Sequence, residues 1–226
     1  MKMQRCRWHG TLRWYVLMLL CFGCSAAFAR HHYRADGQDG VPGQFDYYLM
    51  SLSWSPTYCL THEYDRAQCA GKGYGFVLHG LWPQYDSGGY PHNCAGSSLS
   101  ADAEAIGDSL YPSPKLVQHE WAEHGTCSGL DPMTYFRTAD RASATVRIPA
   151  AFEAPRTTLV MSGDEIASAF RAANPTLPDD SLRVVCSRGQ FSEVRICLTR
   201  TLAVRRCGRG VRNSCPLAPV QIRSTR

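Results

Sequence analysis

The sequence predicts an α+β fold built around a single core. Its 226 residues, of which 44% are hydrophobic, suit one globular domain or at most two small ones. Segments with the pattern of strands lie toward the beginning and the end of the chain, and segments with helix-start signals lie between them. Because strands and helices do not alternate regularly, α+β fits better than a doubly wound α/β fold.

Residues 1–29 have the features of a secretory signal peptide. An apolar run at 14–22 follows four basic residues, and small residues come after it at 27–29. A membrane anchor is disfavoured because the run is shorter than the roughly 20 residues that span a bilayer. A lipoprotein anchor at Cys24 is disfavoured by the large residues before it. We therefore expect a mature protein that starts near Arg30, is secreted or periplasmic, and leaves the membrane after cleavage.

Four segments have the composition of strands, and the first follows a polar stretch at 30–44 that is expected to be mobile. This first strand, FDYYLMSLSW at 45–54, is rich in aromatic and aliphatic residues with partial alternation, and a second is expected at 75–82. After Pro178 the pattern becomes β-rich again at 182–187 and 191–201. Arg188 and Gly189 separate these last two segments, which predicts a hairpin.

Three helices are predicted from capping signals in the middle of the chain. Each signal is a capping residue at the helix start, and the third forms a capping box with a glutamate: Ser113-Pro114, Asp131-Pro132 and Ser162 with Glu165. The third helix is expected to end at Asn174, before Pro175.

The cysteine count predicts disulfides. Three of the eleven cysteines lie in the signal peptide, and an even number remains: Cys59, Cys69, Cys94, Cys127, Cys186, Cys197, Cys207 and Cys215. In an exported protein these indicate four disulfides, although eight cysteines allow 105 pairings. Zinc is the competing use of cysteine, but these residues contain no C-x-x-C pair and their spacings are unlike those of structural zinc sites.

Charge is unevenly distributed along the chain. The net charge of +5 falls to 20 minus 19, or +1, when the four basic residues of the signal peptide are removed. Residues 182–226 nevertheless contain ten arginines and a single acid, Glu193. Such a region can collect phosphates, or it can simply be a soluble surface of a chain that uses arginine in place of lysine.

The segment HEWAEHGTC at 119–127 carries the densest group of titratable residues. A helix from 114 to 124, closed by Gly125, would place Glu120 and His124 on one face because they are four residues apart. His119 lies roughly 100° around the helix from Glu120 and can reach the edge of the same pocket. The alternative is that these residues form an ordinary polar helix surface.

The same segment resembles the H-E-x-x-H signature of zinc hydrolases. Zinc binding on one helix face needs histidines four residues apart, whereas His119 and His124 are five apart and roughly 140° out of alignment. We therefore expect no metal at this site.

A second candidate segment, FVLHGLWPQ at 76–84, leads an apolar strand directly into His79. A histidine at a strand end is often a hydrogen-bonded structural residue. Here Gly80 leaves room beside it for a ligand, and Trp82 offers an aromatic face on which a base can stack.

HGLWPQ at 79–84 and HEWAEHGTC at 119–127 resemble the two signature segments of the ribonuclease T2 family. Their order and separation also match, and the resemblance extends over most of residues 45–216. It implies one catalytic domain at 45–226, in which an antiparallel sheet is flanked by helices and stabilised by disulfides. It also implies a monomer that cleaves single-stranded RNA by transphosphorylation through a 2′,3′-cyclic phosphate to a 3′-phosphate, with no metal or other cofactor.

The resemblance implies a role for each site residue. His124 is the base, His79 the acid and Glu120 a group that assists the transition state. The resemblance also implies four substrate-binding residues. His119 binds phosphate, Trp82 and Tyr90 form a wall for the base, and Gln84 stands at a base-reading position. RNA supplies its own nucleophile, so a base, an acid and charge stabilisation suffice, and histidines titrate near neutrality.

The resemblance also implies the disulfide pairs Cys59–Cys69, Cys94–Cys127, Cys186–Cys215 and Cys197–Cys207. Two positions depart from the family pattern. Gln84 replaces an aspartate found in some relatives, and Glu123 replaces the usual lysine. We expect Glu123 to lie within a helical turn of the scissile phosphate, or alternatively to pair with an arginine. An inactive relative that serves as a secreted binding or signalling protein remains the other functional class, against which the intact His79, Glu120 and His124 argue.

Overall fold

The computed structural model describes residues 38–92 and 94–225. The predicted signal peptide at 1–29 and the first part of the polar stretch at 30–44 lie outside the described residues. Within the described part of the chain, no helix is both long and apolar enough to cross a membrane.

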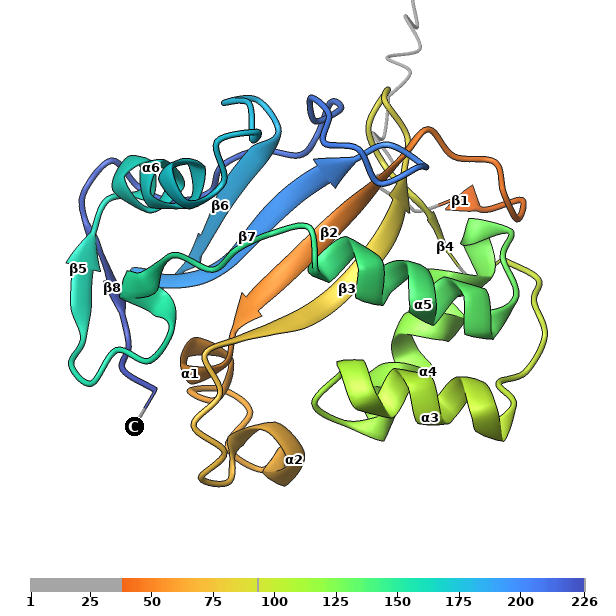
Figure 1. The fold of residues 1–226 in the computed structure, drawn as a ribbon, viewed down its shortest axis with the longest axis horizontal. Coiled ribbons are helices and arrows are strands. Elements are labelled where there is room, and N and C mark those ends of the chain that lie inside the picture. Colours follow the sequence, from red (N-terminus) through yellow and green to blue (C-terminus); the bar gives the residue numbers. More distant parts are fainter. Residues whose placement is uncertain (1–37, 93, 226) are drawn as a thin grey trace, which may run out of the picture. The chain divides into compact units, whose positions relative to one another are not determined.

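A six-stranded sheet forms the centre of the fold (Figure 1). Its strands follow the order β3-β2-β7-β8-β5, and β6 pairs with β7 as well. All pairs are antiparallel except the short contact between β7 and β8, so the predicted antiparallel sheet is confirmed with one exception. The strands are β2 (Tyr47–Trp54), β3 (Phe76–Gln84), β5 (Leu159–Met161), β6 (Leu182–Ser187), β7 (Gln190–Leu198) and β8 (Val220–Ile222).

The four predicted strands correspond to β2, β3, β6 and β7, with ends shifted by no more than three residues. The hairpin between β6 and β7 turns at Arg188 and Gly189, both with positive φ (51° and 74°), as a tight two-residue turn requires. β7 stops at Leu198, before the predicted end at 201, because the chain turns at Leu202, where φ is 68°.

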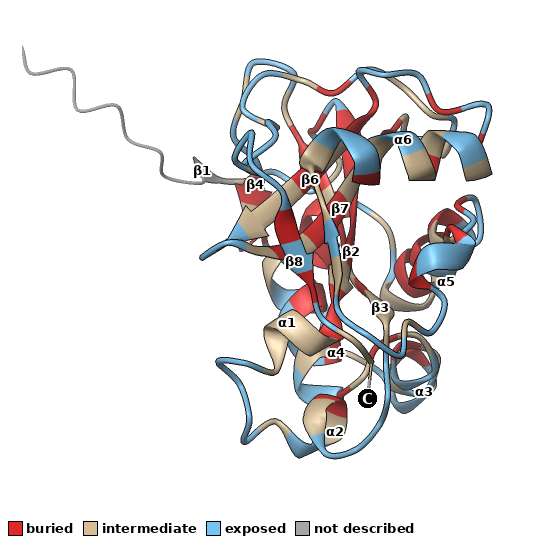
Figure 2. Cartoon of the chain, turned by 90° about the vertical axis from the view of Figure 1, so that its left-hand side faces the viewer, coloured by how far each residue is buried: buried red, intermediate tan, exposed pale blue. Residues whose placement is uncertain are grey.

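The two faces of the sheet differ in composition. Met50 and Leu52 of β2 and Val194 and Ile196 of β7 are buried in the main core. Because side chains alternate along a strand, Ser51 and Glu193 point to the opposite face. Helix α5 turns its buried residues toward the apolar face (Figure 2). The face opposite the main core therefore combines buried polar side chains with a smaller apolar cluster that includes Tyr47, Leu49 and Cys197.

Helices α4 (Pro114–Glu123), α5 (Pro132–Ser143) and α6 (Gly163–Ala173) confirm the three predicted helices. Their capping side chains, Ser113, Asp131 and Ser162, each accept a hydrogen bond from the third residue of the helix, and Ser162 with Glu165 completes the capping box. The helices not predicted are α1 (Ser55–Tyr58), α2 (Arg66–Cys69), α3 (Ala101–Leu110) and the 3-10 helices η1 (Gly125–Ser128) and η2 (Ala150–Phe152).

Four disulfides join the pairs that the family resemblance implies. Cys94–Cys127 is the one nearest the predicted site, because it links the loop after β4 to η1, which directly follows His124. This link fixes the segment that follows α4 against the loop after β4.

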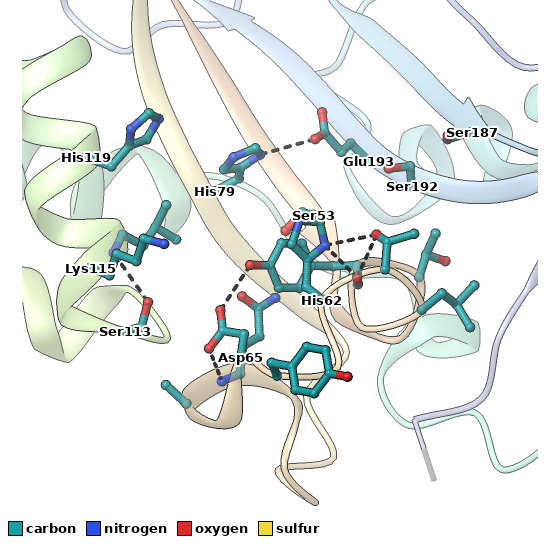
Figure 3. A pocket seen from close by; sticks show the side chains of 18 of the residues that line it. Ser53, His62, Asp65, His79, Ser113, Lys115, His119, Ser187, Ser192 and Glu193 are labelled. Carbon is teal, nitrogen blue, oxygen red and sulfur yellow. Dashed lines mark hydrogen bonds and ion pairs between the residues drawn. The ribbon is translucent and has the colours of Figure 1, made fainter.

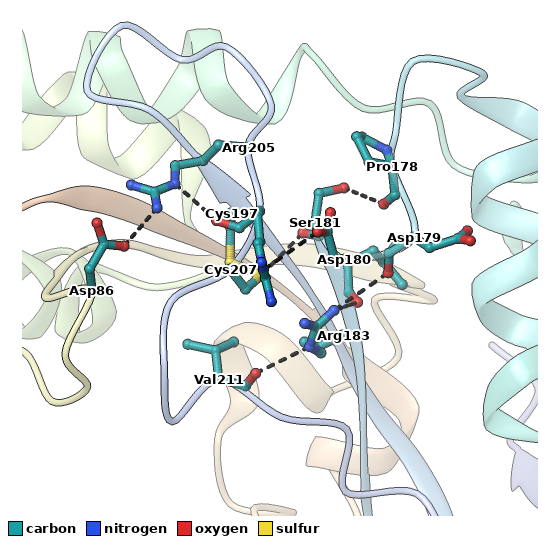
Figure 4. Close-up of polar contacts among 12 residues, drawn as sticks. Asp86, Pro178, Asp179, Asp180, Ser181, Arg183, Cys197, Arg205, Cys207 and Val211 are labelled. Carbon is teal, nitrogen blue, oxygen red and sulfur yellow. Dashed lines mark hydrogen bonds and ion pairs between the residues drawn. A yellow bond between two sulfur atoms is a disulfide. The ribbon is translucent and has the colours of Figure 1, made fainter.

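Several of the C-terminal arginines have partners within the protein (Figure 4). The side chain of Arg183 donates to the carbonyl of Val211 (3.1 Å), and Arg205 pairs with Asp86 (2.6 Å). Together with the Cys197–Cys207 disulfide, these contacts hold the loops after β7. For Arg183 and Arg205, the observed role is structural.

The last residues of the polar stretch at 30–44 contact the folded domain. Strand β1 (Gln38–Asp39) pairs in parallel with β4 (Pro91–His92), and the amide of Gly43 donates to the carbonyl of Cys127 at 2.9 Å. This part of the stretch, expected to be mobile, is hydrogen-bonded to the loops that border the candidate site.

Candidate active site

His79 occupies a bulge in the edge strand β3. Gly80 pairs with Ser51 and Leu78 with Leu52, so His79 is the extra residue between them. A bulge shifts the alternation of side chains by one residue. Leu78 and Leu81 consequently both face the main core, while the rings of His79 and Trp82 lie 5.1 Å apart on the other face.

Gly80 is needed because Glu120 approaches the strand closely. A Cβ atom at position 80 would collide with Oε2 of Glu120 and with Nε1 of Trp82. These two atoms are themselves joined by a hydrogen bond, in which the Trp82 indole donates to Glu120 at 2.8 Å. The absence of a side chain at Gly80 thus lets α4 dock its carboxylate against β3.

Helix α4 brings three of the predicted residues to the same place. Glu120 is fully buried, and His124, which directly follows the last residue of the helix, has only 8% of its surface exposed. The ring of His124 lies 5.3 Å from that of Trp82 and 6.3 Å from that of His119. The two signature segments therefore meet at Trp82.

Tyr90 and Gln84 differ in how well they suit substrate binding. Tyr90 is 40% exposed and its ring lies 5.9 Å from that of His124. Gln84 is 7% exposed, and its side-chain amide donates to the carbonyl of Pro83. Among the described residues, the contacts therefore favour Tyr90 and not Gln84 as part of a binding wall.

Burial separates the proton affinities of the site residues. Burial, with smaller contributions from His119 and His79, lowers the pKa of His124 to about 3. Burial also raises the pKa of Glu120 to about 8, although His79 and the Trp82 hydrogen bond oppose it. At neutral pH, His124 is therefore neutral and Glu120 is mainly protonated.

The surroundings of His79 have the opposite effect on its proton. Burial lowers the pKa of the imidazole, but the hydrogen bond and the charge of Glu193 outweigh it, so the pKa of His79 lies above its ordinary value. Nδ1 of His79 lies 3.2 Å from Oε1 of Glu193 (Figure 3). Glu193 was noted in the sequence only as the single acid of a basic region, and its contact with His79 spans 114 residues.

Two buried polar atoms of the site have no hydrogen-bond partner among the described residues. They are Oε1 of Glu120 and Nδ1 of His124. An unpaired buried polar atom is costly for stability. Such atoms are typical of a site that makes its hydrogen bonds with a ligand.

Glu123 pairs with a histidine and not with an arginine, which was the alternative expectation. Its carboxylate lies 3.2 Å from Nδ1 of His92, whose ring is 5.8 Å from that of Tyr90. That Glu123 lies within a helical turn of the scissile phosphate stays a prediction. Glu123 thus connects the end of α4 to β4.

A cavity of about 1130 Å³ opens beside His79 and His119 (Figure 3). It continues past Lys115 and past the turn that holds Arg188. Its lining includes the basic residues Arg66, Lys115 and Arg188 as well as the acids Asp65 and Glu193, and it does not include Glu120, His124 or Trp82. The cavity therefore borders the candidate site on the side of His79.

The expectation that His119 and His124 point too far apart around the helix to share a metal ion is wrong. Ligand atoms of His119, Glu120 and His124 all lie within 4.8 Å of one another. The reason is that His124 has left the helix, with φ −124° and ψ −45°, so the rotation of about 100° per residue does not extend to it. That no metal is needed here therefore stays a prediction.

Relatives of this chain are named as ribonucleases. A family model described as the Ribonuclease T2 family matches residues 45–207. Ribonuclease DdI of Dictyostelium discoideum is 30% identical over 190 residues, which cover 75% of this chain and 81% of that protein. A ribonuclease of Aeromonas hydrophila is 50% identical over 100 residues, but this match covers only 44% of this chain and 46% of that protein.

Solved structures agree with this similarity. A mutant of ribonuclease MC1 from bitter gourd in complex with 5′-GMP has a TM-score of 0.56 and 26% identity, covering 76% of this chain and 98% of that one. An RNase-related protein from Calystegia sepium has a TM-score of 0.62 and 24% identity, covering 78% and 98%. With the family model matching most of the described residues, the chain belongs to the ribonuclease T2 family.

Proposed function

We propose that the protein is an endoribonuclease that cleaves single-stranded RNA by transphosphorylation. The observation that carries the proposal is the meeting of His79, Glu120 and His124 around Trp82, with two histidines whose proton affinities are pushed apart. Titratable groups with opposite shifts are typical of an acid and a base that work together.

In the first half of the reaction, the neutral imidazole of His124 takes the proton of the 2′-hydroxyl. The 2′-oxygen then attacks the adjacent phosphorus. A base must be unprotonated at the working pH, which the buried position of His124 favours.

His79 completes the step by protonating the 5′-oxygen as the bond between phosphorus and that oxygen breaks. The product is a 2′,3′-cyclic phosphate and a free 5′-hydroxyl. Water then opens the cyclic phosphate to a 3′-phosphate, with the two histidines in exchanged roles.

Negative charge on the phosphoryl oxygens needs nearby donors during both steps. Glu120, kept mainly protonated at neutral pH by burial, can donate a hydrogen bond from its unpaired Oε1. His119 is exposed at the edge of the same site and can contact the phosphate.

The rings of Trp82 and Tyr90 flank His124 and offer faces for a base. The 5′-GMP complex of the ribonuclease MC1 mutant supports a nucleotide ligand for this fold. A preference for a particular base does not follow from these contacts.

Export and a monomeric state are part of the proposal. Four disulfides are typical of proteins from an oxidising compartment, and the signal-like segment at 1–29 agrees with this. Amino-terminal sequencing of the exported protein tests the cleavage site near Arg30, and light scattering tests the monomer.

A direct test incubates the purified protein with RNA and with DNA, each with and without a chelator. We expect cleavage of RNA alone, unaffected by the chelator, and a transient 2′,3′-cyclic phosphate detected by mass spectrometry. Cleavage that the chelator abolishes would assign the cluster of His119, Glu120 and His124 to a metal. Binding of RNA without cleavage would identify an inactive binding protein.

A further inference from the structure

We infer that Glu193 is a positioning residue for His79, holding its imidazole so that Nε2 faces the substrate. This inference rests on the proposed function, in which His79 is the acid. Oε1 of Glu193 lies 3.2 Å from Nδ1 of His79, and both side chains border the same cavity (Figure 3).

The carboxylate of Glu193 is itself firmly held. Its Oε2 accepts hydrogen bonds from Oγ of Ser51 at 3.1 Å and from Nε of Arg195 at 2.8 Å. Glu193 is 9% exposed and lies on β7, between β2 and β6. Two fixed donors on one oxygen therefore leave the other oxygen aimed at His79.

This contact determines which nitrogen of His79 exchanges protons. Arg195 and His79 hold the pKa of Glu193 down to about 2, against the effect of burial, so the carboxylate is ionised and only accepts. Nδ1 of His79 must then carry a proton in both charge states of the ring. Nε2 is left to give its proton to the 5′-oxygen and to regain one afterwards.

The charges around His79 come from two elements. Glu193 and Arg195 lie on β7, while Glu120 and His124 lie on α4 and at its end. The ionised Glu193 favours the protonated ring, Glu120 does so to a smaller extent and only when it is ionised, and Arg195 opposes it. Because Arg195 also lies over the ring of Trp82, 5.5 Å from its centre, it links the carboxylate to the expected base wall.

A purely structural role is the alternative. Glu193 could serve only to anchor Ser51 and Arg195 within the sheet. The two roles differ in what they predict for the His79 ring, since anchoring the sheet does not require any particular tautomer or proton affinity of that histidine.

The first measurement uses the unaltered protein. Nitrogen-15 chemical shifts of its histidine rings, followed through a pH titration, report the protonated nitrogen of neutral His79. We expect the proton on Nδ1. A neutral ring protonated on Nε2 would overturn the inference, whatever reaction the protein catalyses.

The second measurement compares Glu193→Gln with Glu193→Asp and with the exposed control Glu153→Gln. In Glu193→Gln we expect a lower pKa of His79, an alkaline limb of kcat/KM shifted to lower pH, and a loss in kcat of about 10–100-fold, as for other partners of functional histidines. The change in KM should be smaller than the change in kcat, because Glu193 reaches the expected base wall only through Arg195. Glu193→Asp keeps the charge and should recover part of the activity, while Glu153→Gln should behave as the unaltered protein.

The outcomes separate the two claims. An unaltered protein that does not cleave RNA contradicts the proposed function. An active protein in which Glu193→Gln keeps both the His79 pKa and the pH profile contradicts this inference alone. If Glu193→Gln does not fold, the same titration is carried out on Glu193→Asp. Its shorter carboxylate should lower the pKa of His79 by part of the change expected for Glu193→Gln. An unchanged pKa of His79 in Glu193→Asp refutes the inference.

Discussion

The indole of Trp82 donates a hydrogen bond to Glu120, 38 residues further along the chain, at 2.8 Å. This bond joins the edge strand β3 to helix α4 directly beneath Gly80, where a side chain would collide with both partners. Small changes at this junction should therefore displace both side chains of the site.

Gly80→Ala is expected to reduce kcat/KM at least tenfold, because displacing Glu120 and Trp82 misaligns the site by a fraction of an ångström or more. Gly71→Ala is the control, since position 71 has open space around it but a positive φ of 67°. That control should lose about 1 kcal/mol of stability and keep its activity. Equal activities of the two variants, measured beside their thermal unfolding, would contradict the close-approach argument.

His79→Ala and His124→Ala should each lose most of the turnover, since each removes half of an acid and base pair. Such groups typically contribute about 10²–10⁴-fold. The fold should persist, as checked by circular dichroism and thermal unfolding. Retention of more than a tenth of the activity in either variant would mean that the reaction does not use these two histidines as proposed.

The pH dependence of kcat/KM should be bell-shaped and displaced to the acid side. The base must be unprotonated, so activity falls as pH drops through the pKa of His124, which burial lowers to about 3. The acid must be protonated, so activity falls as pH rises through the raised pKa of His79. An acid limb near pH 6.5, the ordinary value for histidine, would show that the buried position of His124 does not govern its titration.

Glu120→Gln should change the pH dependence of stability. Because the pKa of Glu120 is raised to about 8 in the folded protein, from an ordinary value of 4.5, the folded state holds its proton more tightly than the unfolded state does. This contribution is complete below pH 4.5 and is lost as pH rises to about 8. Urea unfolding across this window should therefore show a decline in the native protein that Glu120→Gln lacks, and parallel curves would contradict the assignment.

Glu123→Lys should raise kcat/KM at low salt, because it replaces a charge that repels RNA with one that attracts it. The gain should shrink as salt screens the site. Glu123→Gln removes the negative charge and the pair with His92, a partly exposed contact worth at most about 1 kcal/mol, without adding a positive charge, and it should show a smaller gain than Glu123→Lys. Equal rates of the native protein and Glu123→Lys at low salt would place this residue outside the reach of the substrate.

Local signals explain what the sequence predicts well. Ser113, Asp131 and Ser162 cap their helices because each side chain meets an amide only three residues away. The turn at Arg188 and Gly189 is equally local. Helix α3 has such a signal in Ser100, but it lacks the proline or the capping box that marks the other three.

Features that depend on distant contacts are not visible in the sequence. Strands β5 and β8 are three residues each, and they pair with one another across the chain and, through β8, with β7. The pairing of Glu193 with His79 requires β7 to lie beside β2, and the bulge at His79 appears only in the register of β2 and β3. The prediction that His119 and His124 lie too far apart around the helix to share a metal was wrong, because it assumed that the helix includes His124, whereas the helix ends at Glu123.

The bulge at His79 sets a limit for anyone who wishes to make this protein more robust. Removing the extra residue would restore an unbroken β3 opposite β2, the kind of regularity that idealised sequences favour. Because the extra residue is His79 itself, the same repair would delete the proposed acid from the site. A regular strand β3 and an active enzyme therefore exclude one another at this position. This is a trade-off between stability and activity.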